Sequence, residues 1–288
     1  MKARRSWTWV LAAALWMPGM LHGADGHAEV SFKLYAGYAI VAPGAIGGLG
    51  KLNFLIDTGA VPSAVDRRMA GELKLTGATE SVSVFSQTVQ VQRAVVPSVQ
   101  LGPIQAQSVP VMVVDLRRVE EGFGVRIDAI IGLDVLIQSS FTIDYRSKKI
   151  FFGPVKRSGA AAQFHVQYKA GAPYVVVPVD VNDHTFRLLL DTGARDLILF
   201  EARVWSQLGG LRAGRTEITL TAAGEERRRE LQLPDVRLGK TGFGKRKGFL
   251  WDIPAYSLRE LDGLVGPASL GLRRIAFDFE HRTLTWER

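Results

Sequence analysis

The sequence predicts an all-β protein of two similar lobes related by a pseudo-twofold axis, with a few short helices. The first observation is an internal duplication in which three blocks recur at one offset. The second is a series of short apolar and β-branched runs divided by Gly, Pro and Asn-Asp turns, as strands are. The third is a strand–turn–strand pattern at the end of each copy, Phe141–Phe152 and Ile275–Trp286. Two β-rich copies predict a pair of packed lobes rather than a longer repeat array.

The duplication rests on three pairs of blocks that are each 134 residues apart. A lone Asp-Thr-Gly arises by chance in roughly one of 20 chains of this length, and on its own it is best explained as a carboxylate that caps a turn. A second copy aligned with two further blocks is not accidental. The pairs are Phe54–Ala60 with Leu188–Ala194, Asp128–Gly132 with Asp262–Gly266, and Ile143–Tyr145 with Phe277–Phe279.

The remaining elements follow from local patterns. Short helices are expected near Leu133–Gln138, Arg203–Leu208 and Ala268–Leu272. Gly and Ala residues between 158 and 162 indicate a linker, so we divide the chain into lobe 1 (29–154), a linker (155–165) and lobe 2 (166–288). The clearest strand runs are Tyr38–Val41, Leu52–Ile56, Val109–Val114, Tyr174–Val179 and Ile218–Leu220.

The first 24 residues are interpreted as a secretory signal peptide. Lys2, Arg4 and Arg5 precede a 15-residue apolar stretch, Trp7–Leu21, and small residues follow it. This length suits export and is short for a membrane span, although an uncleaved N-terminal anchor is the alternative. We therefore expect a periplasmic or secreted protein with no stable membrane span after cleavage.

Composition excludes several kinds of chemistry. The absence of cysteine rules out disulfides, thiolate metal sites and a cysteine nucleophile. The five histidines are scattered, so neither a metal nor an organic cofactor is expected. Without the signal peptide, 33 basic residues face 28 acidic ones. This modest excess lies in short runs typical of solvated loops, and no nucleic-acid partner is expected.

The repeated Asp-Thr-Gly blocks carry the candidate chemistry. An apolar strand that ends in this motif places a carboxylate on a tight turn, and the glycine permits close approach of a second turn. If the lobes pair about a twofold axis, Asp57 and Asp191 meet across it and share one proton. One carboxylate can then accept a proton from water while the other donates one to a carbonyl oxygen.

Two copies of apolar-apolar-Asp-Thr-Gly-Ala, each followed by an apolar-apolar-Gly block, resemble the aspartic protease superfamily of pepsins and retropepsins. The resemblance covers residues from about 30 to 288. It implies two acid-protease β-barrel lobes with Asp57 and Asp191 as the catalytic pair in a cleft between them. It also implies supporting roles for Thr58, Gly59, Ala60, Thr192, Gly193 and Ala194, with Gly132 and Gly266 in the ψ-shaped loop beneath each aspartate.

The chain departs from the pepsin pattern in two places. Pepsins usually carry Ser or Thr where this chain has Ala60 and Ala194. Loss of a hydroxyl donor should raise the pKa of the pair, so we expect a mildly acidic to neutral pH optimum. The flaps that the resemblance implies fall at Val82–Val91 and Thr219–Glu226, and only the second has a small-residue tip.

These observations predict an exported, monomeric aspartic endopeptidase that acts on peptide or protein substrates. The alternative is a catalytically idle envelope protein that binds peptides in the same cleft, which the unusual first flap favours. A third hypothesis is a structural protein held to the envelope by its basic loops.

Overall fold

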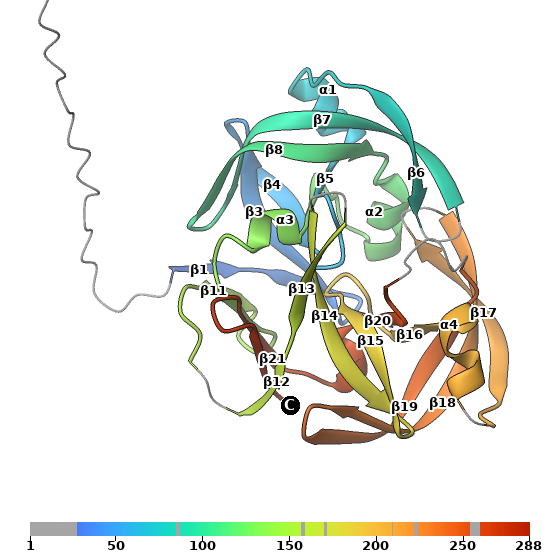
Figure 1. Ribbon diagram of the computed structural model, residues 1–288. Coiled ribbons are helices and arrows are strands. Elements are labelled where there is room, and N and C mark those ends of the chain that lie inside the picture. The colour runs from blue at the N-terminus through green and yellow to red at the C-terminus, as the bar shows by residue number, and fades with distance from the viewer. Residues whose placement is uncertain are drawn as a thin grey trace, which may run out of the picture.

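The computed structural model describes residues 28–84, 87–156, 159–169, 172–208, 210–221, 224–253 and 260–288. Within these residues the chain forms two eight-stranded sheets and one six-stranded sheet, with a few short helices (Figure 1). The fold is therefore all-β and two-lobed, as the sequence predicts. The signal peptide proposed for residues 1–24 lies outside the described residues. No helix in the described ranges is long and apolar enough to cross a membrane.

Lobe 1 is built on an eight-stranded sheet of order β2-β3-β4-β9-β5-β8-β7-β6. Its three helices are α1 (Arg67–Glu72), α2 (Arg117–Phe123) and α3 (Leu133–Leu136). The strands are β2 (Lys33–Tyr35), β3 (Ala39–Ile46), β4 (Leu49–Ile56), β5 (Ala64–Asp66), β6 (Thr79–Val84), β7 (Gln87–Leu101), β8 (Ile104–Val114) and β9 (Ala129–Ile131).

Lobe 2 repeats this sheet strand for strand, in the order β13-β14-β15-β20-β16-β19-β18-β17. Its helices are α4 (Glu201–Val204) and the 3₁₀ turns η1 (Trp205–Gln207) and η2 (Pro267–Leu270). The strands are β13 (His165–Lys169), β14 (Ala172–Val181), β15 (His184–Leu190), β16 (Leu197–Phe200), β17 (Ala213–Thr221), β18 (Gly224–Leu238), β19 (Thr241–Trp251) and β20 (Gly263–Val265).

Each eight-stranded sheet curls onto itself. In lobe 1 the second strand of the order, β3, also pairs with the seventh, β7, and in lobe 2 the equivalent strands β14 and β18 pair in the same way. Such a cross-pairing bends the sheet toward a barrel and buries one face of it. The identical strand order confirms that the sequence duplication is a structural duplication.

The six-stranded sheet joins the two lobes. It has the order β1-β11-β10-β21-β22-β12, with three strands from each half of the chain. At its centre β10 pairs with β21 so that Phe141 faces Phe277 and Ile143 faces Ile275. This self-complementary register is that of a twofold interface. The strands are β1 (Ala28–Ser31), β10 (Phe141–Asp144), β11 (Lys149–Phe152), β12 (Ala160–Gln163), β21 (Arg274–Asp278) and β22 (Thr283–Glu287).

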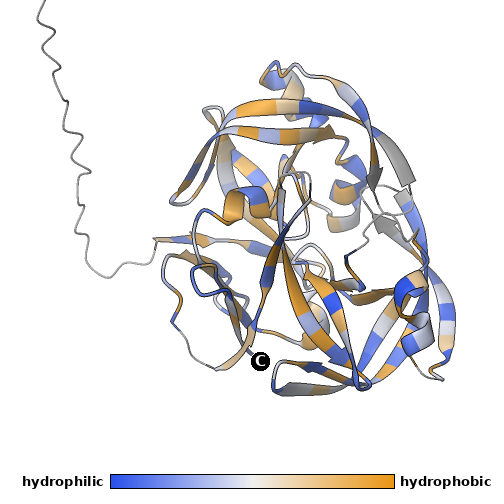
Figure 2. Cartoon of the chain, in the orientation of Figure 1, coloured by the Kyte–Doolittle hydropathy of each residue, from blue (hydrophilic) through white to orange (hydrophobic). Residues whose placement is uncertain are grey.

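The shared sheet carries one hydrophobic core through both lobes. Phe141 and Phe277 are fully buried and their rings stack with centroids 4.6 Å apart. Apolar and polar residues alternate along the outer strands, as the banded colours of β7 and β8 show in Figure 2. Two smaller apolar clusters lie beside the main core, one in each lobe, and they include Ala60 and Ala194 at their margins.

The elements predicted from local pattern form as expected, and three more were not predicted: helices α1 and α2 of lobe 1 and strand β12. The terminal strand–turn–strand patterns are the hairpins β10–β11 and β21–β22, and the three predicted helices lie at α3, α4–η1 and η2. The predicted linker 155–165 contains β12, which pairs with β22 at the edge of the shared sheet. The division into 29–154 and 166–288 stays a prediction, because strands of both halves complete one sheet. Ser158 lies outside the described residues.

Candidate active site

The two Asp-Thr-Gly loops lie at equivalent ends of their sheets. Asp57 directly follows β4, and Asp191 directly follows β15. Each of these strands pairs in parallel with the strand of the second repeated block, β4 with β9 and β15 with β20. The Asp57 amide donates to the Ile131 carbonyl oxygen at 3.0 Å, and the Asp191 amide donates to that of Val265 at 3.1 Å. The repeated blocks are therefore neighbours in space that hold each aspartate at the end of a buried strand.

Reciprocal hydrogen bonds from two threonines join the loops across the pseudo-twofold axis. The Thr58 amide donates to Thr192 Oγ1 at 3.0 Å, and the Thr192 amide donates to Thr58 Oγ1 at 3.1 Å. Each hydroxyl in turn donates to a carbonyl oxygen of the other lobe, Thr58 to Leu190 at 2.7 Å and Thr192 to Ile56 at 3.0 Å. Both threonines are buried. These four bonds fix the position of one loop relative to the other.

The two glycines of the motifs leave room for the opposite aspartate. A Cβ atom on Gly59 would lie 2.5 Å from the Asp191 carboxyl carbon, and one on Gly193 would lie 2.4 Å from the Asp57 carboxyl carbon. Real Cβ atoms do not approach other atoms this closely. Any other residue at either position would therefore push the two carboxyl groups apart.

Gly132 and Gly266 meet a similar steric requirement beneath the loops. A Cβ on Gly132 would lie 2.1 Å from the Ala60 carbonyl oxygen, and one on Gly266 would lie 2.0 Å from that of Ala194. The backbone after β9 or β20 thus touches the backbone of the Asp-Thr-Gly-Ala segment directly. The place of both glycines in a ψ-shaped loop stays a prediction.

A family model for aspartyl proteases matches residues 42–135 and 177–255, more than half of the chain, and both Asp-Thr-Gly loops lie within the match. The chain belongs to the aspartyl protease family. Membership of this family supports protease activity and peptide substrates. A search among curated proteins found no match.

In this aspartyl protease each carboxyl group lies against the glycine of the opposite loop, so the two groups are close neighbours across the axis. Burial raises the pKa of both aspartates, and the negative charge of Asp57 raises that of Asp191 further. Asp57 Oδ1 accepts the amides of Gly59 and Ala60 at 2.9 and 3.1 Å, and Asp191 Oδ1 accepts that of Gly193 at 2.8 Å. The Gly193 amide also lowers the pKa of Asp57, and the Ala194 amide lowers that of Asp191, so Asp57 has three such donors and Asp191 has two. The richer set of donors favours the charge on Asp57 and the shared proton on Asp191.

The positions 60 and 194 contribute backbone amides to this arrangement, and their methyl groups add no donor. The rise in pKa has the direction that the sequence predicts from the two alanines. Its largest cause, however, is burial of the carboxyl groups between the lobes. Burial of this kind appears only when the lobes pack together.

The other repeated aspartates have structural roles. Asp128 Oδ2 accepts the Asn53 amide, and Asp262 Oδ2 accepts the amide of Arg187, which is the equivalent residue of lobe 2; both distances are 2.9 Å. Each bond ties the start of the second repeated block to the strand that leads into the Asp-Thr-Gly loop. Asp144 lies in the β10–β11 hairpin, where it accepts two backbone amides of the turn.

Sequence reasoning missed a buried polar pair under the loop of lobe 1. The Ser63 hydroxyl donates to Asp134 Oδ1 at 2.6 Å and accepts the Gly132 amide at 2.9 Å, while the Ser63 amide donates to Asp134 Oδ2. Leu197 and Ala268 occupy the equivalent positions of lobe 2. The pair therefore breaks the repeat, and its only signal in the sequence is that break.

A second missed group lies beside the loop of lobe 2. Arg228 on β18 contacts Asp196 at 2.8 Å, and its guanidinium carbon lies 3.8 Å from the centre of the Phe249 ring. The side chain of Arg228 is only 14% exposed, so this ion pair is shielded from solvent. It joins the Asp-Thr-Gly loop to the strand that forms the second predicted flap.

Both predicted flaps fall on β-hairpins. Strands β6 and β7 pair up to Val84 and Gln87, and β17 and β18 pair up to Thr221 and Gly224. Helix α2 of lobe 1 contacts β17 of lobe 2, so the lobes also touch beside the second hairpin (Figure 1). The intervening residues 85–86 and 222–223 lie outside the described residues, and a role for these hairpins in closure stays a prediction.

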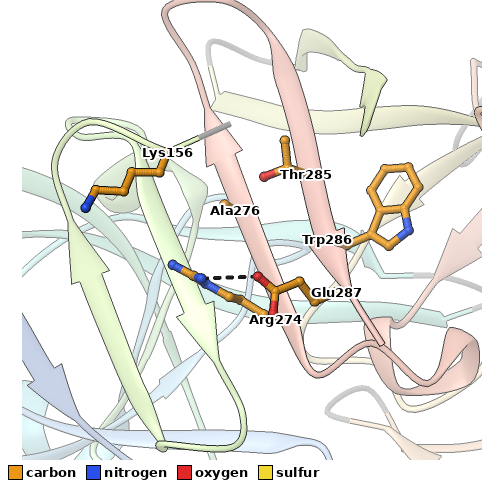
Figure 3. Close-up of a pocket in the computed structure, with 6 residues that line it drawn as sticks. All are labelled: Lys156, Arg274, Ala276, Thr285, Trp286 and Glu287. Carbon is orange, nitrogen blue, oxygen red and sulfur yellow. Dashed lines mark hydrogen bonds and ion pairs between the residues drawn. The ribbon is translucent and has the colours of Figure 1, made fainter. Parts of the chain in front are cut away.

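Two hollows of the described surface lie away from the aspartates. Figure 3 shows one at the shared sheet, where Arg274 and Glu287 form an ion pair at 3.2 Å beside Lys156. A neighbouring hollow of about 140 Å³ shares Lys156 and Arg274 with it. None of the lining residues belongs to either Asp-Thr-Gly loop. Among the described residues, no group of three or more His, Asp or Glu side chains is arranged to hold a metal ion.

Proposed function

We propose that this chain is an endopeptidase in which Asp57 and Asp191 activate a water molecule for attack on a peptide bond. The observation that carries the proposal is the packing of each carboxyl group against the glycine of the opposite loop, on two loops that are joined by reciprocal threonine bonds. Two carboxyl groups this close share one proton, because the cost of a second buried negative charge is large. The pair therefore holds one acid and one base at the same time.

The chemistry assigns one role to each aspartate. Ionised Asp57 accepts a proton from water as the water oxygen bonds to the carbonyl carbon, and Asp191 donates its proton to the carbonyl oxygen. The tetrahedral diol then collapses: the C–N bond breaks, Asp57 gives its proton to the nitrogen, and Asp191 takes a proton back from one diol hydroxyl. A carboxylic acid and an amine leave, and the pair returns to its starting state. No covalent bond to the protein forms. The reaction therefore requires only that the two carboxyl groups be correctly placed and that one have a lower pKa than the other.

The remaining motif residues hold the two aspartates in the required arrangement. Thr58 and Thr192 set the distance between the loops, while Gly59 and Gly193 allow the carboxyl groups to meet. One chain supplies both halves of the site, which supports a monomer as the active form. We also propose that residues 1–24 direct export to the periplasm or the medium, on the basis of their basic start and apolar stretch.

The test is cleavage of a mixed peptide library by the chain from residue 25 onward, at pH values from acidic to neutral. Asp57→Asn and Asp191→Asn should each lower kcat/KM by at least about a hundredfold, the usual scale for loss of an acid or base. Asp144→Asn is the matched control, because that aspartate repeats in the sequence but holds a hairpin turn. Fractionation of cells that express the full chain tests export.

Cleavage that persists in both Asn variants would overturn the assignment. A folded wild-type protein that binds peptides at every pH and cleaves none would support the idle peptide-binding alternative. Attachment to envelope fractions that is lost in high salt and survives Asp57→Asn would support the structural hypothesis.

A further inference from the structure

We propose that Arg195 forms a cationic subsite beside the aspartate pair and favours substrates with an acidic side chain close to the cleaved bond. This inference rests on the proposed function, since it names the substrate class of the same site. It starts from a position where the two lobes differ: Arg195 directly follows the Asp-Thr-Gly-Ala motif of lobe 2, and Val61 follows that of lobe 1.

The backbone on both sides of Arg195 is held in place. The Gly266 amide donates to the Asp196 carbonyl oxygen at 3.0 Å. A Cβ on Gly266 would meet the Ala194 carbonyl oxygen at 2.0 Å and the Arg195 carbonyl carbon at 3.0 Å, so this backbone lies directly on the glycine. The Asp196 side chain is fixed in turn by Arg228. The Arg195 side chain therefore starts from a rigid point next to the aspartate pair.

The charge of Arg195 is unpaired within the described part of the chain. Arg195 is exposed, and it makes no ion pair or side-chain hydrogen bond within the part of the chain that the structure describes. Its neighbour Asp196 is already paired with Arg228, whose second guanidinium nitrogen lies 3.9 Å from Glu217. One positive charge beside the loop is thus left for a ligand.

Arg195 lies close to the aspartates along the chain. It follows Asp191 by four residues and Gly193 by two, and a Cβ on Gly193 would lie 2.4 Å from the Asp57 carboxyl carbon. Burial, Asp196 and Asp191 raise the pKa of the Tyr38 phenol, while Arg195 and Arg228 lower it, which agrees with this placement. Tyr38 comes from lobe 1 and packs edge-on against Phe123 of α2, with ring centroids 5.8 Å apart. A peptide that reaches Asp191 should therefore pass close to Arg195.

A substrate carboxylate is the ligand that this site fits. The guanidinium group carries a permanent charge and a planar set of donors that matches a carboxylate. On the other side of the axis, Val61 packs against the hydrophobic core and offers no charge. The preference should therefore concern one side of the cleaved bond only.

The experiment compares peptide pairs that differ only by Asp or Glu against Asn or Gln at positions flanking the cleaved bond. It is run above about pH 5, where these side chains are ionised. In low salt the wild type should cleave the acidic member about fivefold better, the upper range for an exposed ion pair. Arg195→Val, which copies lobe 1, should bring this ratio to about one, and Arg195→Lys should keep most of it. Arg237→Val is the control, an exposed arginine on β18 opposite the far end of β14.

Binding of the same pairs to Asp57→Asn separates this inference from the proposed function, because it needs no cleavage. A higher affinity for the acidic member that disappears when Arg195→Val is added would support the subsite even if the wild type were inactive. Equal affinity and equal cleavage of both members by the protein with Arg195 intact would overturn it. A ratio that is unchanged in Arg195→Val, with thermal unfolding showing a folded variant, would overturn it as well.

Discussion

The two lobes hold their aspartate loops in the same geometry by different chemistry. In lobe 1 the Gly132 amide finds its acceptor in the Ser63 hydroxyl, which a buried carboxylate holds in place. In lobe 2 the Gly266 amide finds a backbone carbonyl instead, and the fully buried Leu197 fills the place of the serine. The comparison teaches that the loop requires an acceptor for one buried amide, and either a side chain or the backbone satisfies it.

A second difference lies at the first helix of each lobe. Asp66 caps α1, where its carboxylate accepts the Arg68 and Leu116 amides at 2.9 Å. Phe200 stands at the equivalent position before α4 and makes no side-chain cap. Lobe 1 thus depends on buried polar groups at two points where lobe 2 depends on apolar packing. The lobes should therefore respond differently to pH and to truncation.

The largest effect on activity should come from the motif glycines that the two lobes have in common. Gly59→Ala and Gly193→Ala each place a methyl group about where the opposite carboxyl carbon lies, and should lower kcat/KM by about a hundredfold, as a misplacement of roughly 1 Å does. Gly71→Ala on α1, where the added methyl meets nothing, is the control. Normal cleavage of library peptides by either loop variant would show that the carboxyl groups need not touch.

Truncation of the equivalent residues Leu197 and Ser63 should have different effects on stability in the two lobes. Leu197→Ala should lower the free energy of unfolding by about 2–5 kcal/mol at any pH, because it leaves a cavity. Ser63→Ala should cost about 1–3 kcal/mol, because Asp134 Oδ1 loses the hydroxyl donor and the Gly132 amide loses its acceptor, while the amide of residue 63 still donates to Asp134 Oδ2.

The pH dependence sharpens this contrast. Burial raises the pKa of Asp134, and the bonds from Ser63 lower it. Loss of Ser63 raises the pKa further, so the penalty in Ser63→Ala should grow as the pH rises above the ordinary range for aspartate. Denaturant unfolding at acidic and neutral pH measures both variants. An equal pH dependence of the two would contradict the comparison.

Asp66→Ala should show a pH dependence of the same sign, but over a lower pH range, because the pKa of Asp66 is lowered and that of Asp134 is raised. Burial alone would raise the pKa of Asp66, but hydrogen bonds from Arg68 and the Leu116 amide outweigh it and lower the pKa. The carboxylate therefore stabilises the protein above the ordinary pKa of aspartate, and this is lost as the pH falls through it. Thermal unfolding at neutral pH should show a loss of about 1 kcal/mol that shrinks on acidification. Asp115→Ala, which removes an exposed ion pair, should change little.

The smallest expected effect concerns which aspartate of the pair holds the shared proton. Because both pKa values are raised, the wild type should show a bell-shaped profile of kcat/KM with a mildly acidic to neutral optimum. Ala194→Ser adds a donor beside Asp191 and should move the upper limb of the profile down by up to about one pH unit. Ala60→Ser should move the lower limb instead, because it acts on Asp57. A strongly acidic optimum, or limbs that respond in the reverse order, would contradict the assignment of the proton to Asp191.

Local and repeated features were predictable from the sequence. The β-runs, the terminal hairpins and the two Asp-Thr-Gly loops leave a pattern in the chain because each depends on residues close in sequence or on a second copy. The glycines at 132 and 266 were also found in this way, since both lobes need the same backbone contact under the loop. The flap hairpins were located, although residues at their tips carry no periodic signal.

Contacts across the twofold axis were decided only by the tertiary structure. The register of Phe141 with Phe277, the inclusion of β12 in the shared sheet and the threonine bonds between loops exist only once the lobes pack. So does the burial that raises the pKa of the aspartate pair. Ser63, Asp134 and Arg195 have no like residue at the equivalent position of the other lobe. A difference of this kind between the two copies does not reveal which contacts the residues make. The sequence by itself thus determined the two halves and their reactive groups, while packing determined the electrostatics between them, because desolvation and charge coupling depend on distances that only the folded chain defines.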